Sequence, residues 1–177
     1  MLNSVTPERA EALRETLPAD RFSSVEARYL EEPRGRYAGQ GGLVAHPRST
    51  DEVATLIRAA AQARVPVIPY GGGTGLVGGQ IAPDGPIPLI LSLDKMTAIR
   101  ALHPEENVVI AEAGVILADV QRAADEVRRL FPLSLAAEGS ARIGGNLSTN
   151  AGGTGVLRYG NARDLCLVIE AVLPSGE

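Results

Sequence analysis

The feature that most constrains this chain is a glycine-rich stretch, residues 138–160, with the sequence EGSARIGGNLSTNAGGTGVLRYG. It holds seven glycines and two asparagines, and almost none of its side chains is bulky enough to fill a core. Glycine allows positive φ angles and close backbone approach, at an entropic cost that an ordinary connection avoids. The stretch therefore predicts a binding loop whose backbone lies close to a ligand.

A second glycine-rich run, residues 70–79, lies upstream and reads YGGGTGLVGG. A tight connection between two strands needs one or two glycines, whereas this run has six. Successive backbone N–H groups that are free to curl form a nest for anionic oxygens, and a phosphate or diphosphate fits best. Two such loops, separated by ordinary strand and helix patterns, indicate one extended ligand that is bound at two places.

Hydroxyl and amide side chains accompany the glycines of both loops. In the first loop, Thr74 adds a hydroxyl donor to the backbone N–H groups. The second loop carries a set that can bond a ribityl chain, a ribose or further phosphate oxygens: Ser140, Asn146, Ser148, Thr149 and Asn150.

The first loop also contains a GxGxxG string, residues 73–78, placed after a short apolar strand, with Asp94 about 20 residues further on. Taken alone, this pattern predicts a Rossmann NAD site. That fingerprint requires a helix to begin inside the motif. The residues that follow, 79–86, read GQIAPDGP and cannot form one. We therefore reject the Rossmann interpretation on its context.

Composition excludes several other classes of protein. A net charge of −4, 3% aromatic residues and no tryptophan do not favour a nucleic-acid groove or a base-stacking platform. The sequence has no apolar run of the roughly 18 residues that cross a bilayer and no signal peptide, so we expect a cytoplasmic protein or a soluble peripheral subunit. With one cysteine and two histidines, no metal-ligand cluster is expected.

The remaining pattern predicts short strands and helices. Helices are expected at residues 7–17, after Thr6 and Pro7; at 50–65, after a capping box at Ser49; at 117–127; and at about 143–149. Residues 22–42 show no clear period and are expected to form an arm over the surface. Strands are expected at residues 43–46, 67–69, 87–93, 99–102, 108–112 and, as a buried core strand, 165–173.

The two loops together carry a family resemblance. PYGGGTGLVGG, then EGSARIGGNLSTNAGG, then LRYGNARDLCLVIEAVLPSGE, in this order, resemble the FAD-binding domain of the vanillyl-alcohol oxidase / p-cresol methylhydroxylase (PCMH) superfamily. Within it, the chain is most similar to the FAD-linked D-2-hydroxyacid dehydrogenases, which include glycolate oxidase FAD subunits, D-lactate dehydrogenases and D-2-hydroxyglutarate dehydrogenases.

The resemblance implies an α+β, two-lobed PCMH-type domain with FAD held between the lobes. Residues 1–41 would be an N-terminal helix and arm, and residues 42–177 the FAD-binding domain, with lobes at about 42–97 and 98–177. A C-terminal cap domain, which in the family supplies the substrate pocket, the base and any metal ligands, is expected to lie outside this sequence. Because residues 174–176 (PSG) turn toward a hairpin just before the last residue, we expect a truncated chain.

The resemblance also implies the cofactor contacts. Some relatives attach FAD covalently through a histidine in the first loop, where this chain has Thr74 and Gly75, so noncovalent FAD is expected. Ser92 is a weaker candidate contact, and no position matches a family base or a metal ligand. The expected cofactor-binding residues are Tyr70, Gly71, Gly72, Gly73, Thr74, Gly75, Gly78 and Gly79 on the diphosphate; Gly144, Gly145, Asn146, Ser148 and Gly153 on the diphosphate and ribityl side; Ser140 and Asn150; and Ile169 through its backbone.

By the same resemblance, the chain is the FAD-binding portion of an oxidoreductase that oxidises a D-2-hydroxy acid to the 2-oxo acid by hydride transfer to flavin N5. The electrons would pass to an acceptor that this sequence does not identify. One alternative is a flavin- or nucleotide-binding module that catalyses nothing, and another is a different oxidase or reductase of the superfamily.

Four further side chains are interpreted as structural or left open. His46 and His103, each followed by proline, are expected to be solvated or capping residues. Cys166, inside an apolar run, is expected to be inert core. Arg142 stands where relatives often have a small or hydroxyl residue, and could pair with a phosphate or lie in solvent.

Overall fold

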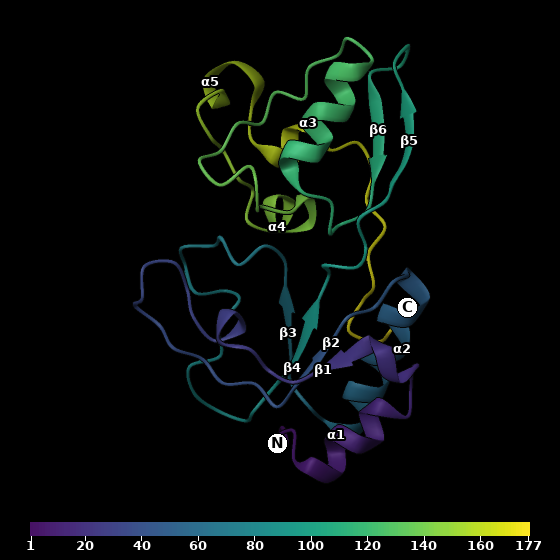
Figure 1. The fold of residues 1–177 in the computed structure, drawn as a ribbon, viewed down its shortest axis with the longest axis vertical. Helices are drawn as coiled ribbons and strands as arrows, with labels where there is room; N and C mark the ends of the chain where they lie inside the picture. Colours follow the sequence, from purple (N-terminus) through teal and green to yellow (C-terminus); the bar gives the residue numbers. More distant parts are fainter. The chain divides into compact units, whose positions relative to one another are not determined.

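The computed structural model describes all 177 residues, and they form two compact units. The first unit comprises Met1–Lys95 together with Glu170–Glu177, and the second comprises Met96–Ile169. Each unit combines helices and strands (Figure 1). No helix is both long and apolar enough to span a bilayer.

A four-stranded sheet forms the centre of the first unit, with the strand order β1-β2-β4-β3. Strands β2 (Leu43–Ala45), β4 (Leu89–Ser92) and β3 (Val67–Tyr70) run parallel, and the short β1 (Phe22–Ser23) pairs antiparallel with β2. Every residue of β2 and β4 is buried, as expected for parallel strands that are covered on both faces. This explains why β4 reads LILS, without alternation of apolar and polar residues.

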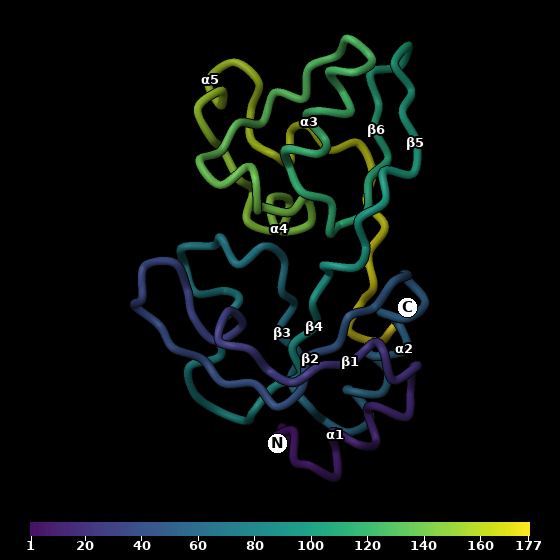
Figure 2. The backbone as a smooth tube through the Cα atoms, in the orientation of Figure 1, coloured from purple at the N-terminus to yellow at the C-terminus, as the bar shows by residue number.

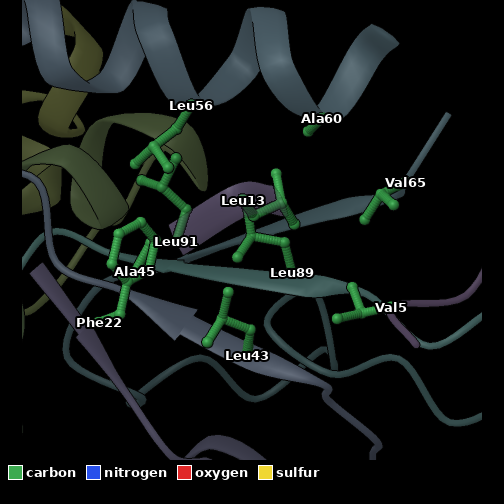
Figure 3. Packing of buried hydrophobic residues seen from close by; sticks show 10 residues of the cluster. All are labelled: Val5, Leu13, Phe22, Leu43, Ala45, Leu56, Ala60, Val65, Leu89 and Leu91. Carbon is green, nitrogen blue, oxygen red and sulfur yellow. The ribbon is translucent and has the colours of Figure 1, made fainter. Parts of the chain in front are cut away.

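Two helices cover one face of this sheet. They are α1 (Pro7–Arg14), capped by Thr6, and α2 (Thr50–Ala63), capped by Ser49, whose hydroxyl accepts the Glu52 N–H. Figure 3 shows Leu56 and Ala60 of α2 pointing toward Leu89 and Leu91 of β4. The C-terminal segment Glu170–Glu177 belongs to the same unit, because the Arg58 guanidinium on α2 donates to the Gly176 carbonyl oxygen at 2.6 Å.

The opposite face of the sheet is covered by the segment between β1 and β2. This segment contains a short 3-10 helix, η2 (Ala27–Tyr29), and follows another, η1 (Ala19–Arg21). Tyr29 packs with Val44, Tyr70 and Ile90 in a second cluster of buried residues. The rings of Tyr29 and Tyr70 meet edge to face, with their centroids 4.7 Å apart. The predicted surface arm therefore contributes directly to the core at its N-terminal end.

The second unit is built on an antiparallel hairpin, β5 (Ile99–His103) and β6 (Val108–Ala111), whose turn contains Asn107 at a positive φ of 55°. Helix α3 (Leu117–Glu126) contacts β6. Three short elements follow: α4 (Ile143–Ser148), α5 (Val156–Tyr159) and the 3-10 helix η3 (Ala162–Leu165). Leu117 of α3, Leu133 and Ala162 form the buried centre of this unit.

The helices and strands expected from the sequence are found with small shifts of their ends, with one exception. The expected core strand at residues 165–173 is wrong: the segment after η3 is not a strand, and the side chains of Leu167, Val168 and Ile169 are 78%, 88% and 66% exposed. An apolar run becomes a strand only where another strand pairs with its N–H and C=O groups. No strand of this chain pairs with these residues.

Candidate functional site

The first glycine loop, residues 71–79, follows β3 directly. It is anchored at Tyr70, which is buried and donates its hydroxyl to the Arg28 carbonyl oxygen at 2.7 Å. Gly73 has a φ of 70°, and a Cβ atom there would lie 2.2 Å from the Tyr70 hydroxyl oxygen. Only glycine therefore fits at this position. No helix begins between residues 71 and 88, which confirms that the GxGxxG string is not a Rossmann motif.

The backbone of this loop presents a run of free donors. None of the N–H groups of residues 71–79 donates a hydrogen bond within the chain. The loop is instead fixed by its carbonyl groups: Gly75 accepts from the Gln80 amide at 2.8 Å, and Gly78 accepts from the Ile81 N–H at 3.0 Å. Thr74 lies among these donors and is partly exposed. A run of free backbone N–H groups is the set of donors that an anion-binding nest requires.

The second loop is organised by α4, in the second unit. Its start is held by the Ile143 N–H donating to Val115 O at 3.0 Å and the Gly144 N–H donating to Ala113 O at 2.8 Å. A Cβ atom at Gly144 would lie 2.7 Å from the Ala113 Cβ, so this glycine is required by packing. A Cβ atom at Gly145 would meet nothing within 4 Å. The face of α4 at Gly145 is therefore open.

Two buried donors beside these glycines have no partner within the chain. Asn146 is 6% exposed, and its Nδ2 makes no hydrogen bond. The Nε of Arg142 is likewise buried and unpaired, although the Nη1 of the same guanidinium donates to Gly114 O. Unsatisfied buried donors are rare in folded proteins and call for a specific explanation. Phosphate or ribityl oxygens of a dinucleotide would satisfy them, so these residues fit such a ligand.

The hydroxyl groups of the second loop are engaged with nearby carbonyl groups. Ser148 donates to Gly144 O at 2.7 Å, and Thr149 donates to Gly145 O at 2.9 Å. Ser140 donates weakly to Ala137 O, at 3.4 Å. Their oxygen atoms keep lone pairs for a ligand, but their protons are used within the fold.

Asn150 and Gly153 have structural roles that the sequence did not reveal. Asn150 adopts a φ of 52°, and its Oδ1 accepts the Arg163 N–H at 3.1 Å. Gly153 has a φ of 83°, and a Cβ there would lie 2.0 Å from Ser134 O. The glycine at position 153 is therefore required by contact with the chain itself, whatever the ligand.

A shallow hollow of about 480 Å³ brings two of the expected residues, Ser148 and Ile169, together in the second unit. Arg163 forms part of its wall and is fixed by hydrogen bonds to Leu147 O at 3.0 Å and Ser148 O at 2.8 Å. Arg163 was not among the residues expected from the sequence to line a site. The one sequence feature that indicated an ordered position for it is the capping residue Asn161, which precedes the short helix η3. The hollow is lined by Leu147, Ser148, Arg163, Cys166, Leu167, Val168 and Ile169, so Cys166 is a lining residue rather than inert core.

His46 is neither solvated nor a cap, contrary to the expectation from the sequence. It is 9% exposed, with its Nδ1 2.7 Å from Asp94 Oδ1 and its Nε2 2.9 Å from the Ser23 hydroxyl. Burial raises the pKa of Asp94, but the hydrogen bonds from His46 and Ser92 outweigh it and leave that pKa below its usual value. Ser92 is itself 1% exposed, so it lies in this buried network beneath the loop. No group of three His, Cys, Asp or Glu residues is placed to hold a metal ion.

Comparison with known proteins adds the family. The family model described as "FAD binding domain" matches residues 42–177. A D-2-hydroxyglutarate dehydrogenase of Xanthomonas citri pv. viticola is 36% identical over 176 residues, which are 98% of this chain and 37% of the relative's length. The mitochondrial D-2-hydroxyglutarate dehydrogenase of Bos taurus is 39% identical over 138 residues, which are 78% of this chain and 25% of that protein.

Among solved structures, an alkyldihydroxyacetonephosphate synthase superposes with a TM-score of 0.84 at 21% identity, over 99% of this chain and 34% of the other. At this identity the match shows the fold alone. The chain thus spans between about a quarter and somewhat more than a third of the length of these proteins. Together the matches confirm the resemblance to the PCMH-type fold and to the D-2-hydroxyacid dehydrogenase group, and they confirm FAD as the cofactor. Because the family model matches well over half of its residues, the chain belongs to the FAD-binding domain family of FAD-linked oxidoreductases.

Proposed function

We propose that this chain is the FAD-binding portion of an enzyme that oxidises a D-2-hydroxy acid to the 2-oxo acid. The observation that carries the proposal is the first glycine loop, whose N–H groups are all free, in a sequence 36% identical to a D-2-hydroxyglutarate dehydrogenase. When bound, FAD supplies the acceptor for the hydride that leaves the hydroxyl-bearing carbon. The chain itself supplies binding and orientation.

The two loops divide the binding between them in this proposal. The N–H groups of residues 71–79 and the Thr74 hydroxyl bind the diphosphate oxygens, which carry the negative charge. The unpaired amide of Asn146 binds a second polar part of the cofactor. Residues 71–79 contain no histidine, cysteine or tyrosine, so we propose that FAD is held without a covalent bond.

Cofactor binding is tested first on the chain alone. The purified protein is mixed with FAD, desalted and examined by visible absorption, and the retained flavin is then released with denaturant. We expect a yellow protein whose flavin is released intact. A flavin that stays attached after denaturation would contradict noncovalent binding, and a colourless protein would contradict the role of the loops.

The substrate class is tested on the longest natural product that contains this sequence. D-2-hydroxyglutarate, D-lactate and glycolate are added without oxygen, and bleaching of the bound flavin is followed, with the L-enantiomers of the first two as controls. We expect at least one of the three acids to bleach the flavin. For 2-hydroxyglutarate and lactate, which have two enantiomers, only the D-enantiomer should do so. Flavin that is bound but bleached by none of them would favour a module without catalytic activity or another chemistry of the superfamily.

A further inference from the structure

The C-terminal part of the predicted arm, residues 30–42, is fastened to residues 81–85, which follow the first glycine loop, and does not merely cross the surface. Gln40 makes two of the connections: its N–H donates to Ala82 O at 3.0 Å, and its side-chain amide donates to Gly85 O at 2.7 Å. Gly39 packs so closely that a Cβ atom there would lie 2.8 Å from Ile81 Cγ2. Figure 2 shows the backbone of this segment, coloured purple to blue, before the chain enters β2.

The arm also closes on itself and so forms a defined tip. Glu31 and Ala38 form an antiparallel bridge, and the Gly39 N–H donates to Leu30 O at 2.6 Å. At the tip, Tyr37 lies against the loop: a Cβ atom at Gly78 would be 3.1 Å from the Tyr37 ring. The glycine at position 78 therefore makes room for Tyr37, and the residues next to Tyr37 are held beside the nest.

A buried carboxylate fixes the backbone of the tip. Glu32 is 4% exposed and accepts the Arg34 N–H at 2.9 Å and the Arg36 N–H at 2.5 Å. These backbone hydrogen bonds lower the pKa of Glu32 despite its burial. The negative charge of Glu32 therefore stabilises the backbone of the tip. The side chain of Arg36, by contrast, is exposed and makes no hydrogen bond or ion pair within the chain. An unpaired guanidinium is thus held one residue from Tyr37.

The first glycine loop, against which Tyr37 lies, has no full positive charge of its own. Residues 70–80 contain neither lysine nor arginine, whereas a dinucleotide diphosphate carries two negative charges. Guanidinium groups pair with phosphate oxygens through two parallel hydrogen bonds, which are stronger than bonds between neutral groups. We propose that Arg36 is a cofactor-binding residue whose guanidinium pairs with the FAD diphosphate, and that Tyr37, seated on Gly78, positions it. This inference rests on the proposed use of the first loop for the diphosphate.

A substrate carboxylate would offer the same anionic chemistry, so the test separates the two sources. The dissociation constants of FAD, of ADP and of riboflavin, which lacks phosphate, are measured for the full chain by flavin fluorescence and by competition. They are compared among the unmodified protein, Arg36→Gln, Arg36→Lys and the control Arg48→Gln. The control removes an exposed arginine of the same unit that already pairs with Asp20 at 3.1 Å.

We expect Arg36→Gln to weaken FAD and ADP binding about tenfold or more, since hydrogen bonds to charged groups are worth about 1.5–3 kcal/mol. The Lys variant should regain part of the affinity, Arg48→Gln should change little, and riboflavin binding should be the same in all. The salt dependence of FAD affinity should also be smaller in Arg36→Gln.

Unchanged FAD affinity in Arg36→Gln would overturn this inference and would leave a substrate carboxylate as the remaining anion. Equal losses for FAD and riboflavin would overturn it too, because they would show that the substitution acts through the shape of the arm. An unmodified chain that binds no FAD would overturn the proposed use of the loop, and this inference with it.

Discussion

Adjacent glycines of α4 have different environments. Gly144 faces the Ala113 backbone, and a Cβ atom there would be 2.7 Å from the Ala113 Cβ and 3.1 Å from Ala113 O. Gly145 faces open space, yet it stands beside Asn146, whose buried amide is unpaired. The first glycine is thus needed by the fold, and the second has no structural reason for being a glycine within the chain.

We predict that Gly145→Val abolishes FAD binding and leaves the fold intact, because the new side chain would occupy the approach of the cofactor at a position where a Cβ atom meets nothing within 4 Å. Flavin retained after desalting reports the first effect, and far-ultraviolet circular dichroism reports the second. The matched change Gly144→Ala should lower the free energy of unfolding by about 1–3 kcal/mol through overpacking. Full flavin content in folded Gly145→Val would show that α4 is not at the cofactor.

The buried pair of His46 and Asp94 predicts a dependence of stability on pH. The pKa of Asp94 is lowered in the folded state, so its ionised form stabilises the fold above the unfolded pKa of about 4. This contribution is lost as the pH falls through the lower folded pKa. Asp94→Asn should therefore reduce the free energy of unfolding by about 2 kcal/mol at pH 7, and by much less once the pH has fallen below the folded pKa of Asp94.

Urea denaturation across this pH range measures the difference between Asp94→Asn and the unmodified protein. Asp84→Asn is the control, because Asp84 is an exposed aspartate of the same unit. A difference that stays constant from pH 7 to pH 2 would show that ionisation of Asp94 does not contribute.

At the scale of elements, the arm depends on one acid. Glu32→Ala removes the acceptor for the Arg34 and Arg36 N–H groups, so we predict a mobile tip and faster cleavage by trypsin after these two arginines. Limited proteolysis followed by mass spectrometry measures the rate. Glu31→Ala changes the neighbouring exposed acid, whose side chain makes no hydrogen bond or ion pair, and should leave the rate unchanged. Equal rates in both variants would contradict the role of Glu32.

The elements that the sequence predicted correctly are those whose signals are local. The Ser49 cap of α2 and the uninterrupted apolar run of β4 need no distant partner to be recognised. Residues 165–173 show the reverse case, because their apolar side chains predict burial while only a paired strand could provide it. The arm likewise has no period, since part of its order comes from contacts with residues 78–85, more than forty positions along the chain.

The same distinction applies to the candidate site. The glycine loops were recognisable because repeated glycines have few structural uses, and the free N–H groups of residues 71–79 agree with that interpretation. Gly153 shows where recognition from the sequence fails. A Cβ atom at this position would collide with the Ser134 carbonyl oxygen, so packing within the chain already requires a glycine there. His46 was missed because its partner Asp94 lies 48 residues away.

For the whole molecule, exposed apolar residues predict self-association. Leu167, Val168 and Ile169 form a continuous exposed run, and soluble monomers rarely leave such patches uncovered. Val168→Asp should shift the chain toward monomer, whereas Leu157→Asp, at an exposed leucine outside this run, should have a smaller effect. Light scattering over a range of protein concentrations measures the shift. A monomer at all concentrations for the unmodified chain would contradict this prediction.

The division of the chain into units has a consequence for its synthesis. The polypeptide leaves the first unit at Lys95 and rejoins it at Glu170, so the second unit is an insertion within the first. During translation, Met1–Lys95 emerges from the ribosome, but Gly176, which accepts from Arg58 on α2, follows only after the whole insertion. At ordinary elongation rates this delay is on the order of 10 s. During this delay, the surface of α2 at Arg58 remains uncovered in the nascent first unit. A chaperone could bind this surface in that period.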